Sequence, residues 1–230
     1  MSLLFIFLVT IAILVDLRIG SNKFSGPIGV LDALSNLETL DLSNNAFSGT
    51  IPDMFDKLFR LHELVLANNK FDGSIPHTIP HLQTLKTLNL ESNRLGGELP
   101  LGLGSMTDIV TMSLRNNLFE GTIPTQLGRL DDIQTLSLNH NLLSGPIPSE
   151  LGLCFRLTSL HLQNNKLTET IPQELGELSG LSNLKLESNS FQGATMPPQI
   201  CALRDDDLSV LTSDCKHTRK VACDCCTECH

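Results

Sequence analysis

Residues 157–178 read LTSLHLQNNKLTETIPQELGEL, and the first half of this stretch decides the fold. Leu160 and Leu162 flank one polar residue, and this alternation predicts a short strand that turns both leucines toward a core. Asn165 ends the strand, where a short amide can bond to backbone groups of a turn. An Ile-Pro pair then marks the returning segment, because proline restrains the backbone. The stretch therefore predicts one coil made of a strand, a turn and a return path.

The pattern LxLxxN recurs along the whole chain at a nearly constant spacing. The last asparagine of the pattern occurs eight times. The first two of these asparagines are 23 residues apart, and each later one follows the previous one by 24 residues. These positions are Asn22, Asn45, Asn69, Asn93, Asn117, Asn141, Asn165 and Asn189. A run of amphipathic helices is the alternative, but Pro and Gly in each period would break every such helix. One coil cannot bury its own apolar face, whereas eight stacked coils can, so the period predicts a repeat solenoid.

Each repeated position has a physical role. Stacked asparagines predict a structural ladder that satisfies loop amides without a strand partner. Glycine follows four residues after most of these asparagines, as at Gly49, where it permits a tight backbone path; Glu169 is the exception. The residue two after each asparagine is Phe or Leu, which predicts a second inward column. Cys154 falls at an inward leucine position and is expected to be a small buried apolar residue.

The composition excludes several classes of partner and site. The 230 residues carry a formal net charge of -9 and no basic run, which argues against nucleic acid and anionic membrane surfaces as partners. Aromatic residues make up only 4%, with no Trp or Tyr, so leucine and isoleucine must fill the core. The GxxxxGK[ST], HExxH and GxSxG patterns are absent. We therefore expect a non-enzyme that uses no cofactor.

The full repeat, LxxLxLxxNxLxGxIPxxLGxL, resembles the plant-specific class of leucine-rich repeats. The stretch at residues 157–178 carries this motif almost intact, and the resemblance covers residues 14–200 as eight repeats. It implies an α/β-type repeat solenoid, a right-handed horseshoe with a parallel β-sheet on its concave face. The fold class therefore rests on both the period and the resemblance.

Residues 201–230 are expected to cap the solenoid, because a bare end would expose apolar core. They contain six cysteines, which are Cys201, Cys215, Cys223, Cys225, Cys226 and Cys229. An even number in a short extracellular cap favours three disulfides. Zinc binding and redox catalysis are the alternatives, although structural zinc sites usually pair two separated ligand couples. The segment also resembles the C-terminal cap of secreted leucine-rich repeat proteins of diatoms and other stramenopiles, which implies a disulfide clasp.

Residues 1–13 allow three interpretations. The apolar run from Leu3 to Val15 has the length of a signal-peptide core and is too short for an ordinary membrane span. It lacks a basic leader, and Leu14 and Leu17 already match the register of the first repeat. The segment is a signal sequence, a membrane anchor or the start of a truncated gene model. We expect an extracellular or cell-surface protein, with a membrane-anchored form as the alternative.

Two outward columns of the predicted concave sheet are the candidate binding surface. They lie four and two residues before each ladder asparagine and hold varied polar side chains in the central coils. The candidate residues are Asn89, Glu91, Ser113, Arg115, Ser137, Asn139, His161 and Gln163. We expect Arg18 to pair with Asp41, and Arg115 with Glu91, across neighbouring strands. The planar fork of Arg115 also suits a carboxylate or sulfate on a ligand, and His161 would add pH dependence below about pH 6.5.

This surface predicts recognition of a protein, peptide or carbohydrate, with no metal site and no catalysis. A structural component of a cell wall or coat is the alternative. An ice-binding protein is a further alternative, because Thr87, Thr111 and Thr135 recur on successive coils. In a parallel sheet these threonines would lie about 4.8 Å apart. The order of preference is recognition first, a structural role second and ice binding last.

Overall fold

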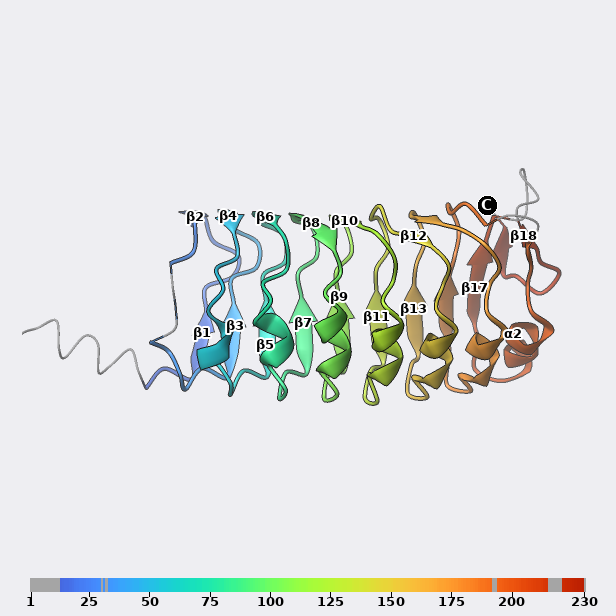
Figure 1. Cartoon of the computed structure of the whole chain (residues 1–230), viewed down its shortest axis with the longest axis horizontal. Coiled ribbons are helices and arrows are strands. Elements are labelled where there is room, and N and C mark those ends of the chain that lie inside the picture. The colour runs from blue at the N-terminus through green and yellow to red at the C-terminus, as the bar shows by residue number, and fades with distance from the viewer. Residues whose placement is uncertain (1–12, 30, 32, 192–193, 215–220, 230) are drawn as a thin grey trace, which may run out of the picture.

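The computed structural model describes residues 13–29, 31, 33–191, 194–214 and 221–229. The chain winds into stacked coils that follow one another in sequence order along the long axis of the molecule (Figure 1). Each regular coil contributes one strand to a long sheet, a turn, a segment of a second wall and a short 3-10 helix. The predicted solenoid with parallel strands is therefore confirmed.

The long sheet forms the concave wall and is parallel throughout. Within the described part of the chain it has ten strands in sequence order, each paired with the strand before and after it. Its strands are β1 (Asp16–Arg18), β3 (Thr39–Asp41), β5 (Glu63–Val65), β7 (Thr87–Asn89), β9 (Thr111–Ser113), β11 (Thr135–Ser137), β13 (Ser159–His161), β15 (Asn183–Lys185), β17 (Val210–Ser213) and β19 (Glu228–Cys229). The central leucines align in register, as Leu40 does with Leu17 and Leu64. This register keeps every repeat position in a straight column.

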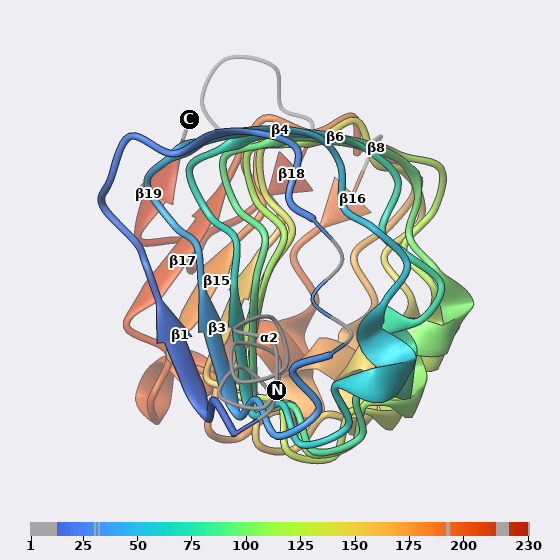
Figure 2. The same cartoon turned by 90° about the vertical axis from the view of Figure 1, so that its left-hand side faces the viewer.

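A second wall of short strands follows the turns, and the sequence pattern did not predict it. Its described strands fall into one group of five and two groups of two. They are β2 (Ser25–Gly26), β4 (Ala46–Thr50), β6 (Lys70–Gly73), β8 (Arg94–Glu98) and β10 (Leu118–Glu120), then β12 (Ser144–Gly145) with β14 (Lys166–Leu167), and β16 (Ala194–Thr195) with β18 (Val221–Ala222). In the view along the stack these strands run across the top (Figure 2). The second wall is segmented, whereas the long sheet is continuous.

Short helices line the side opposite the long sheet (Figure 2). They are η1 (Phe55–Lys57), η2 (Ile79–His81), η3 (Leu101–Ser105), η4 (Thr125–Arg129), η5 (Ser149–Leu153) and η6 (Gln173–Glu177), followed by α2 (Pro198–Ala202) and η7 (Leu203–Asp205). Glycine lets neighbouring helices approach closely, because a Cβ added to Gly128 would lie 2.3 Å from the backbone oxygen of Glu150. The helices therefore stack at the spacing that the strands impose on the other side.

Leucine fills the space between these walls, as the composition predicts. The central residues of the inner strands, such as Leu64 and Leu88, are fully buried. The predicted second inward column begins with phenylalanines, and the rings of Phe47 and Phe71 stack with centroids 6.2 Å apart. Cys154 is buried in the same core, and burial raises the pKa of its thiol to about 11. The interpretation of Cys154 as a small apolar residue is confirmed.

The asparagine ladder joins each coil to the coil before it. The side-chain oxygen of Asn141 accepts a hydrogen bond of 3.1 Å from the backbone N–H of Phe119. Its amide nitrogen donates to the backbone oxygens of Leu114, in the preceding coil, and Leu138, in its own. The other ladder asparagines after the first repeat the contact with the preceding coil. Among the described residues, the side chain of Asn22 bonds only within its own coil.

The one coil without a ladder glycine keeps the same backbone shape. Gly145 has φ of 74°, and Glu169 takes the equivalent position with φ of 63°. A left-handed backbone is unfavourable for a residue with a Cβ. Glu169 therefore adopts this conformation because the neighbouring coils impose it. Among the described strands of the second wall, β14 pairs with β12 and β16 pairs with β18.

The C-terminal segment continues the solenoid before it closes it. Strands β17 and β19 extend the long sheet beyond residue 200. The carboxylate of Asp214 accepts hydrogen bonds from the backbone N–H groups of Ser188 (2.8 Å) and Asn189 (3.0 Å). In earlier coils, backbone oxygens of the following coil accept these bonds. At the end of the ladder, the carboxylate of Asp214 thus supplies the acceptors that a following coil provides elsewhere.

Among the residues that the structure describes, two disulfides hold this cap together. They join Cys201 to Cys225 and Cys223 to Cys226. The prediction of a disulfide-bonded cap is confirmed for these four cysteines. Cys215 and the side chain of Cys229, like residues 1–12, lie outside what the structure describes.

Candidate functional site

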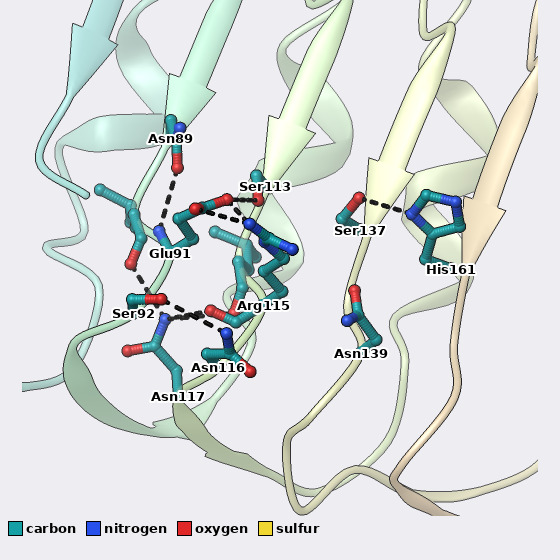
Figure 3. A network of polar contacts seen from close by, with 12 residues as sticks. Asn89, Glu91, Ser92, Ser113, Arg115, Asn116, Asn117, Ser137, Asn139 and His161 are labelled. Carbon is teal, nitrogen blue, oxygen red and sulfur yellow. Dashed lines mark hydrogen bonds and ion pairs between the residues drawn. The ribbon is translucent and has the colours of Figure 1, made fainter. Parts of the chain in front are cut away.

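The structure brings the eight candidate residues onto four adjacent coils. Four of them end strands β7, β9, β11 and β13, and the other four follow two residues later. The sheet register aligns Asn89 with Ser113, and Ser137 with both Ser113 and His161. The close view shows most of these side chains in two neighbouring rows at the ends of the strands (Figure 3).

The candidate residues differ widely in exposure. Ser113, Ser137, Asn139 and Gln163 are each less than a tenth exposed, at 7%, 6%, 4% and 9%. The side chain of Arg115, by contrast, is 45% exposed. The sequence indicates that all eight face outward, but neighbouring coils cover the short side chains. The accessible part of the site is therefore concentrated around Arg115.

Glu91 and Arg115 form the predicted ion pair. The guanidinium donates from Nε to one carboxylate oxygen of Glu91 (2.7 Å) and from Nη2 to the other (2.8 Å). The hydroxyl of Ser113 donates to the same carboxylate at 3.1 Å. These bonds, led by the one from Arg115, lower the pKa of Glu91, and donating to Glu91 raises the pKa of Arg115. One face of the Arg115 fork is thus already occupied by the pairing with Glu91 that the sequence predicted.

The predicted pairing of Arg18 with Asp41 is wrong. Arg18 instead lies 3.2 Å from a carboxylate oxygen of Glu63, two strands away, and 3.7 Å from one of Asp16. Asp41 accepts a hydrogen bond from the backbone N–H of Ser43 at 2.9 Å. The long side chain of Arg18 reaches past the neighbouring strand to Glu63. The carboxylate of Asp41 is already hydrogen-bonded to the backbone of its own turn.

His161 is the titratable residue at the centre of the later coils. Its Nδ1 lies 3.2 Å from the hydroxyl oxygen of Ser137 (Figure 3). Burial lowers the pKa of His161, and the positive charges of Lys185 and Arg115 act in the same direction. Asn183 and Glu187 raise it, but less than burial lowers it. The imidazole is therefore neutral near pH 7.

The threonine column exists as a register, although the threonines are only half-exposed. Thr111 pairs with both Thr87 and Thr135 on the neighbouring strands. Glu63 and Asn183 occupy the same column toward either end. The row is thus three threonines long and is interrupted by charged or amide side chains.

The arrangement offers hydrogen bonding and one ion pair. In the described part of the chain, no group of three or more His, Cys, Asp or Glu side chains is placed to hold a metal ion. Among the same residues, no helix is long and apolar enough to cross a membrane. Sequence reasoning did not single out Asn183. The signal was available, because Asn183 follows Ser159 by one period and so lies beside the strand that ends at His161.

Family profiles and solved structures give a consistent picture. Profiles described as leucine-rich repeat match residues 35–95, and residues 132–154 and 156–178. The structure of the plant peptide hormone receptor RGFR1 in complex with RGF2 is 30% identical, with a TM-score of 0.80 over 82% of this chain and 30% of that chain. A search of curated proteins gave no match.

Two further structures bear on the comparison. The Arabidopsis receptor kinase HAESA, in complex with the peptide hormone IDA and the co-receptor SERK1, is 30% identical with a TM-score of 0.72, over 91% of this chain and 41% of that chain. A plant ice-binding protein is 24% identical with a TM-score of 0.65, over 94% of this chain and 76% of that chain. At this identity, the similarity to the ice-binding protein shows a shared fold only. This chain spans less than half the length of either receptor chain.

Proposed function

Because this chain is a leucine-rich repeat protein, we propose that it is a non-catalytic recognition module that binds a peptide or protein on its concave sheet. The observation that carries the proposal is the ion pair in the middle of that sheet between Glu91, which is largely covered, and Arg115, whose side chain is 45% exposed. Glu91 holds the guanidinium in one orientation through Nε and Nη2. Within the described part of the chain Nη1 makes no hydrogen bond, so it can donate to a carboxylate or carbonyl oxygen of a ligand.

The comparisons support the class of ligand. The titles of two similar structures describe plant receptors in complex with peptide hormones. This chain covers 30% and 41% of those receptor chains, so their ligands and co-receptor cannot be transferred to it directly. We prefer a peptide or protein as the class of ligand, and a carbohydrate is the alternative.

We also propose an extracellular or cell-surface location. Disulfides persist in oxidising compartments, and the described part of the cap contains two of them. Attachment to a membrane would have to come from residues outside the described part of the chain. Secretion of the full-length protein with an epitope tag, followed by surface labelling of intact cells, tests this placement.

The binding proposal is tested on a synthetic peptide array with two matched arginine variants. Arg115→Ala removes the exposed guanidinium from the concave sheet. Arg129→Ala removes an arginine from η4, on the opposite side of the same coil. We expect the wild type and Arg129→Ala to enrich the same peptides, and Arg115→Ala to lose most of that signal. Equal binding by all three proteins would move recognition away from the concave sheet.

A second candidate function rests on the aligned threonines. Regularly spaced hydroxyls on Thr87, Thr111 and Thr135 could order water against ice. The row is short, and Thr111→Lys would interrupt its middle. Thermal hysteresis of the wild type that disappears in Thr111→Lys would favour ice binding over recognition. Neither hysteresis nor any enriched ligand would favour a structural role in a wall or coat.

A further inference from the structure

The first strand of the long sheet is paired on one side only. Among the described strands, β1 (Asp16–Arg18) pairs with β3 and with no other strand. In Figure 2 this end of the stack faces the viewer, and β1 lies at its edge. An unpaired edge presents backbone N–H and C=O groups, which are a template for pairing with another chain. We name the outer side of β1 the open edge.

The apolar core behind the open edge is also uncovered at its end. Phe24 begins the column of stacked rings, and its ring centroid lies 6.1 Å from that of Phe47. Phe24 is 48% exposed, whereas Phe47, which has coils on both sides, is 8% exposed. Leu17 and Ile19 pack against the core but are only partly buried. An unpaired strand and an uncovered core therefore occur at the same end of the molecule.

The backbone groups of β1 divide between its two sides. The backbone oxygen of Val15 accepts a hydrogen bond of 2.8 Å from the second coil, and the backbone N–H of Ile19 donates one of 2.9 Å to it. The backbone groups of every second residue in a strand point to the same side. Those of Asp16 and Arg18 therefore point to the open edge, where each residue offers one donor and one acceptor.

The side chains of β1 are complementary to a second copy of the same strand. An antiparallel pair with its two-fold axis through Leu17 brings Asp16 opposite Arg18 of the second copy, and Arg18 opposite Asp16. These are the residues whose backbone groups face the open edge, so each facing pair exchanges two hydrogen bonds. Opposite charges in facing positions also stabilise a sheet. On the inward side Leu17 lies opposite Leu17 of the second copy, so the two cores join across the axis.

The sequence of β1 favours this register over its neighbours. Sliding one strand along the other by one residue would bring inward side chains opposite outward ones. Sliding it by two residues would bring Asp16 opposite Asp16 of the second copy, or Arg18 opposite Arg18. Like charges in facing positions are destabilising. The charges of β1 therefore select the register centred on Leu17.

Both charged side chains are accessible for this contact. The side chains of Asp16 and Arg18 are 60% and 55% exposed. Within the described part of the chain, Nη2 of Arg18 donates to the hydroxyl of Thr39 and lies 3.2 Å from a carboxylate oxygen of Glu63. These contacts hold the guanidinium at the edge of the sheet through one nitrogen. The other nitrogens of the fork can donate to a facing carboxylate.

We propose that this protein forms a two-fold symmetric dimer in which β1 of one copy pairs antiparallel with β1 of a second copy. The long sheet then continues through both copies, and the uncovered ends of the two cores meet. Because the axis is perpendicular to the sheet, both concave faces point the same way. A closed pair of this kind stops at two copies. The dimer does not depend on the recognition function proposed above.

The first experiment exchanges the charges of β1 in the full chain. Asp16→Arg and Arg18→Asp each place like charges opposite one another twice in the dimer, because the symmetry repeats the contact. Sedimentation velocity should show a dimer for the wild type, with a dissociation constant raised about tenfold or more in either variant. An equal mixture of the two variants restores opposite charges and should restore the dimer. The double variant, which carries both substitutions in one chain, should also form it.

Arg129→Asp on η4 is the control and should leave the dimer unchanged. A wild type that stays a monomer at about 100 μM, where a dimer of micromolar affinity would be largely formed, overturns the proposal. A dimer that neither single variant weakens also overturns it, because association then uses another surface. Loss of the dimer without recovery in the mixture would show that the substitutions damage the coil rather than a facing pair. Oligomers that keep growing with concentration would indicate head-to-tail stacking instead.

The second experiment tests the register with single cysteines. In an antiparallel pair, facing residues that are not hydrogen-bonded have Cα atoms about 4.5 Å apart, which suits a disulfide. Oxidation of Leu17→Cys should therefore cross-link two chains, as measured by non-reducing gel electrophoresis. Ile19→Cys, which would lie opposite Val15 of the second copy, should not cross-link above the level of the wild type. Equal cross-linking of both variants would overturn the pairing of β1 about Leu17.

Discussion

The side-chain oxygen of Asn117 accepts a 3.0 Å hydrogen bond from the backbone N–H of Leu95, which is 22 residues earlier and one coil away. The amide nitrogen of Asn117 donates to the backbone oxygen of Leu90 in that same preceding coil, at 2.9 Å. Because Asn117 is only 6% exposed, water cannot replace these bonds. One side chain therefore satisfies backbone groups that the strands leave unpaired.

Asn117→Ala is expected to lower the free energy of unfolding by roughly 1–3 kcal/mol, because it leaves buried backbone groups unpaired. Asn22→Ala is the control, since Asn22 is exposed and, among the described residues, its side-chain bonds stay within its own coil. Urea denaturation followed by circular dichroism measures both. Equal losses in the two variants would contradict a ladder that acts between coils.

Gly128→Ala is expected to destabilise the protein by about 1–3 kcal/mol through overpacking. The new Cβ would lie 2.3 Å from the backbone oxygen of Glu150, and backbone cannot move as easily as a side-chain end. Gly180→Ala serves as the control, because a Cβ there meets nothing within 4 Å. Thermal melting should separate the two variants clearly, and a similar melting temperature for both would show that η4 and η5 can move apart freely.

His161 should make stability depend on pH. Its pKa is lower in the folded state than the ordinary value of 6.5, mainly because of burial. Below about pH 6.5 the unfolded chain therefore binds more protons, and stability falls as the pH falls. His161→Gln should lose less stability than the wild type between pH 7.5 and pH 5. Urea midpoints at both pH values measure this difference, and parallel pH profiles would contradict it.

Reduction should loosen the C-terminal coils, whereas a chelator should not. Removing a native disulfide typically costs about 2–5 kcal/mol, and Cys201–Cys225 ties α2 to the last coil. Hydrogen exchange of residues 194–214 should rise in dithiothreitol and stay unchanged in EDTA. Non-reducing peptide mapping should recover the peptides of Cys201 and Cys225 linked together. Sensitivity to EDTA with free thiols would instead indicate zinc.

The repeat period predicted the parts of the fold that depend on one residue type at one position. The leucines of the strands, the phenylalanine column and the asparagine ladder all follow from LxLxxN and its spacing. The second wall was not predictable in this way, because segments such as Ser48-Gly49-Thr50 show no apolar alternation. Asp214 was missed for a related reason, since a side chain that replaces backbone oxygens occurs only where the period ends.

The placement of the candidate site and its Glu91–Arg115 ion pair were predicted, whereas the exposure of its side chains was not. The outward direction of Asn139 follows from strand geometry, but its burial depends on the size of the side chains on both neighbouring coils. The choice of Glu63 rather than Asp41 by Arg18 depends on the reach of a long side chain. These properties involve three coils at once, whereas the period describes only one.

The ladder also sets an order for the growing polypeptide. Each asparagine secures the coil made before it, so a coil emerging from the ribosome remains incomplete until the next 24 residues have been synthesised. Folding during synthesis should therefore trail translation by at least one coil. The eighth coil has no ladder asparagine after it, and it waits for Asp214 to accept the bonds of Ser188 and Asn189. The last turn of the ladder therefore closes only after Asp214 has been synthesised.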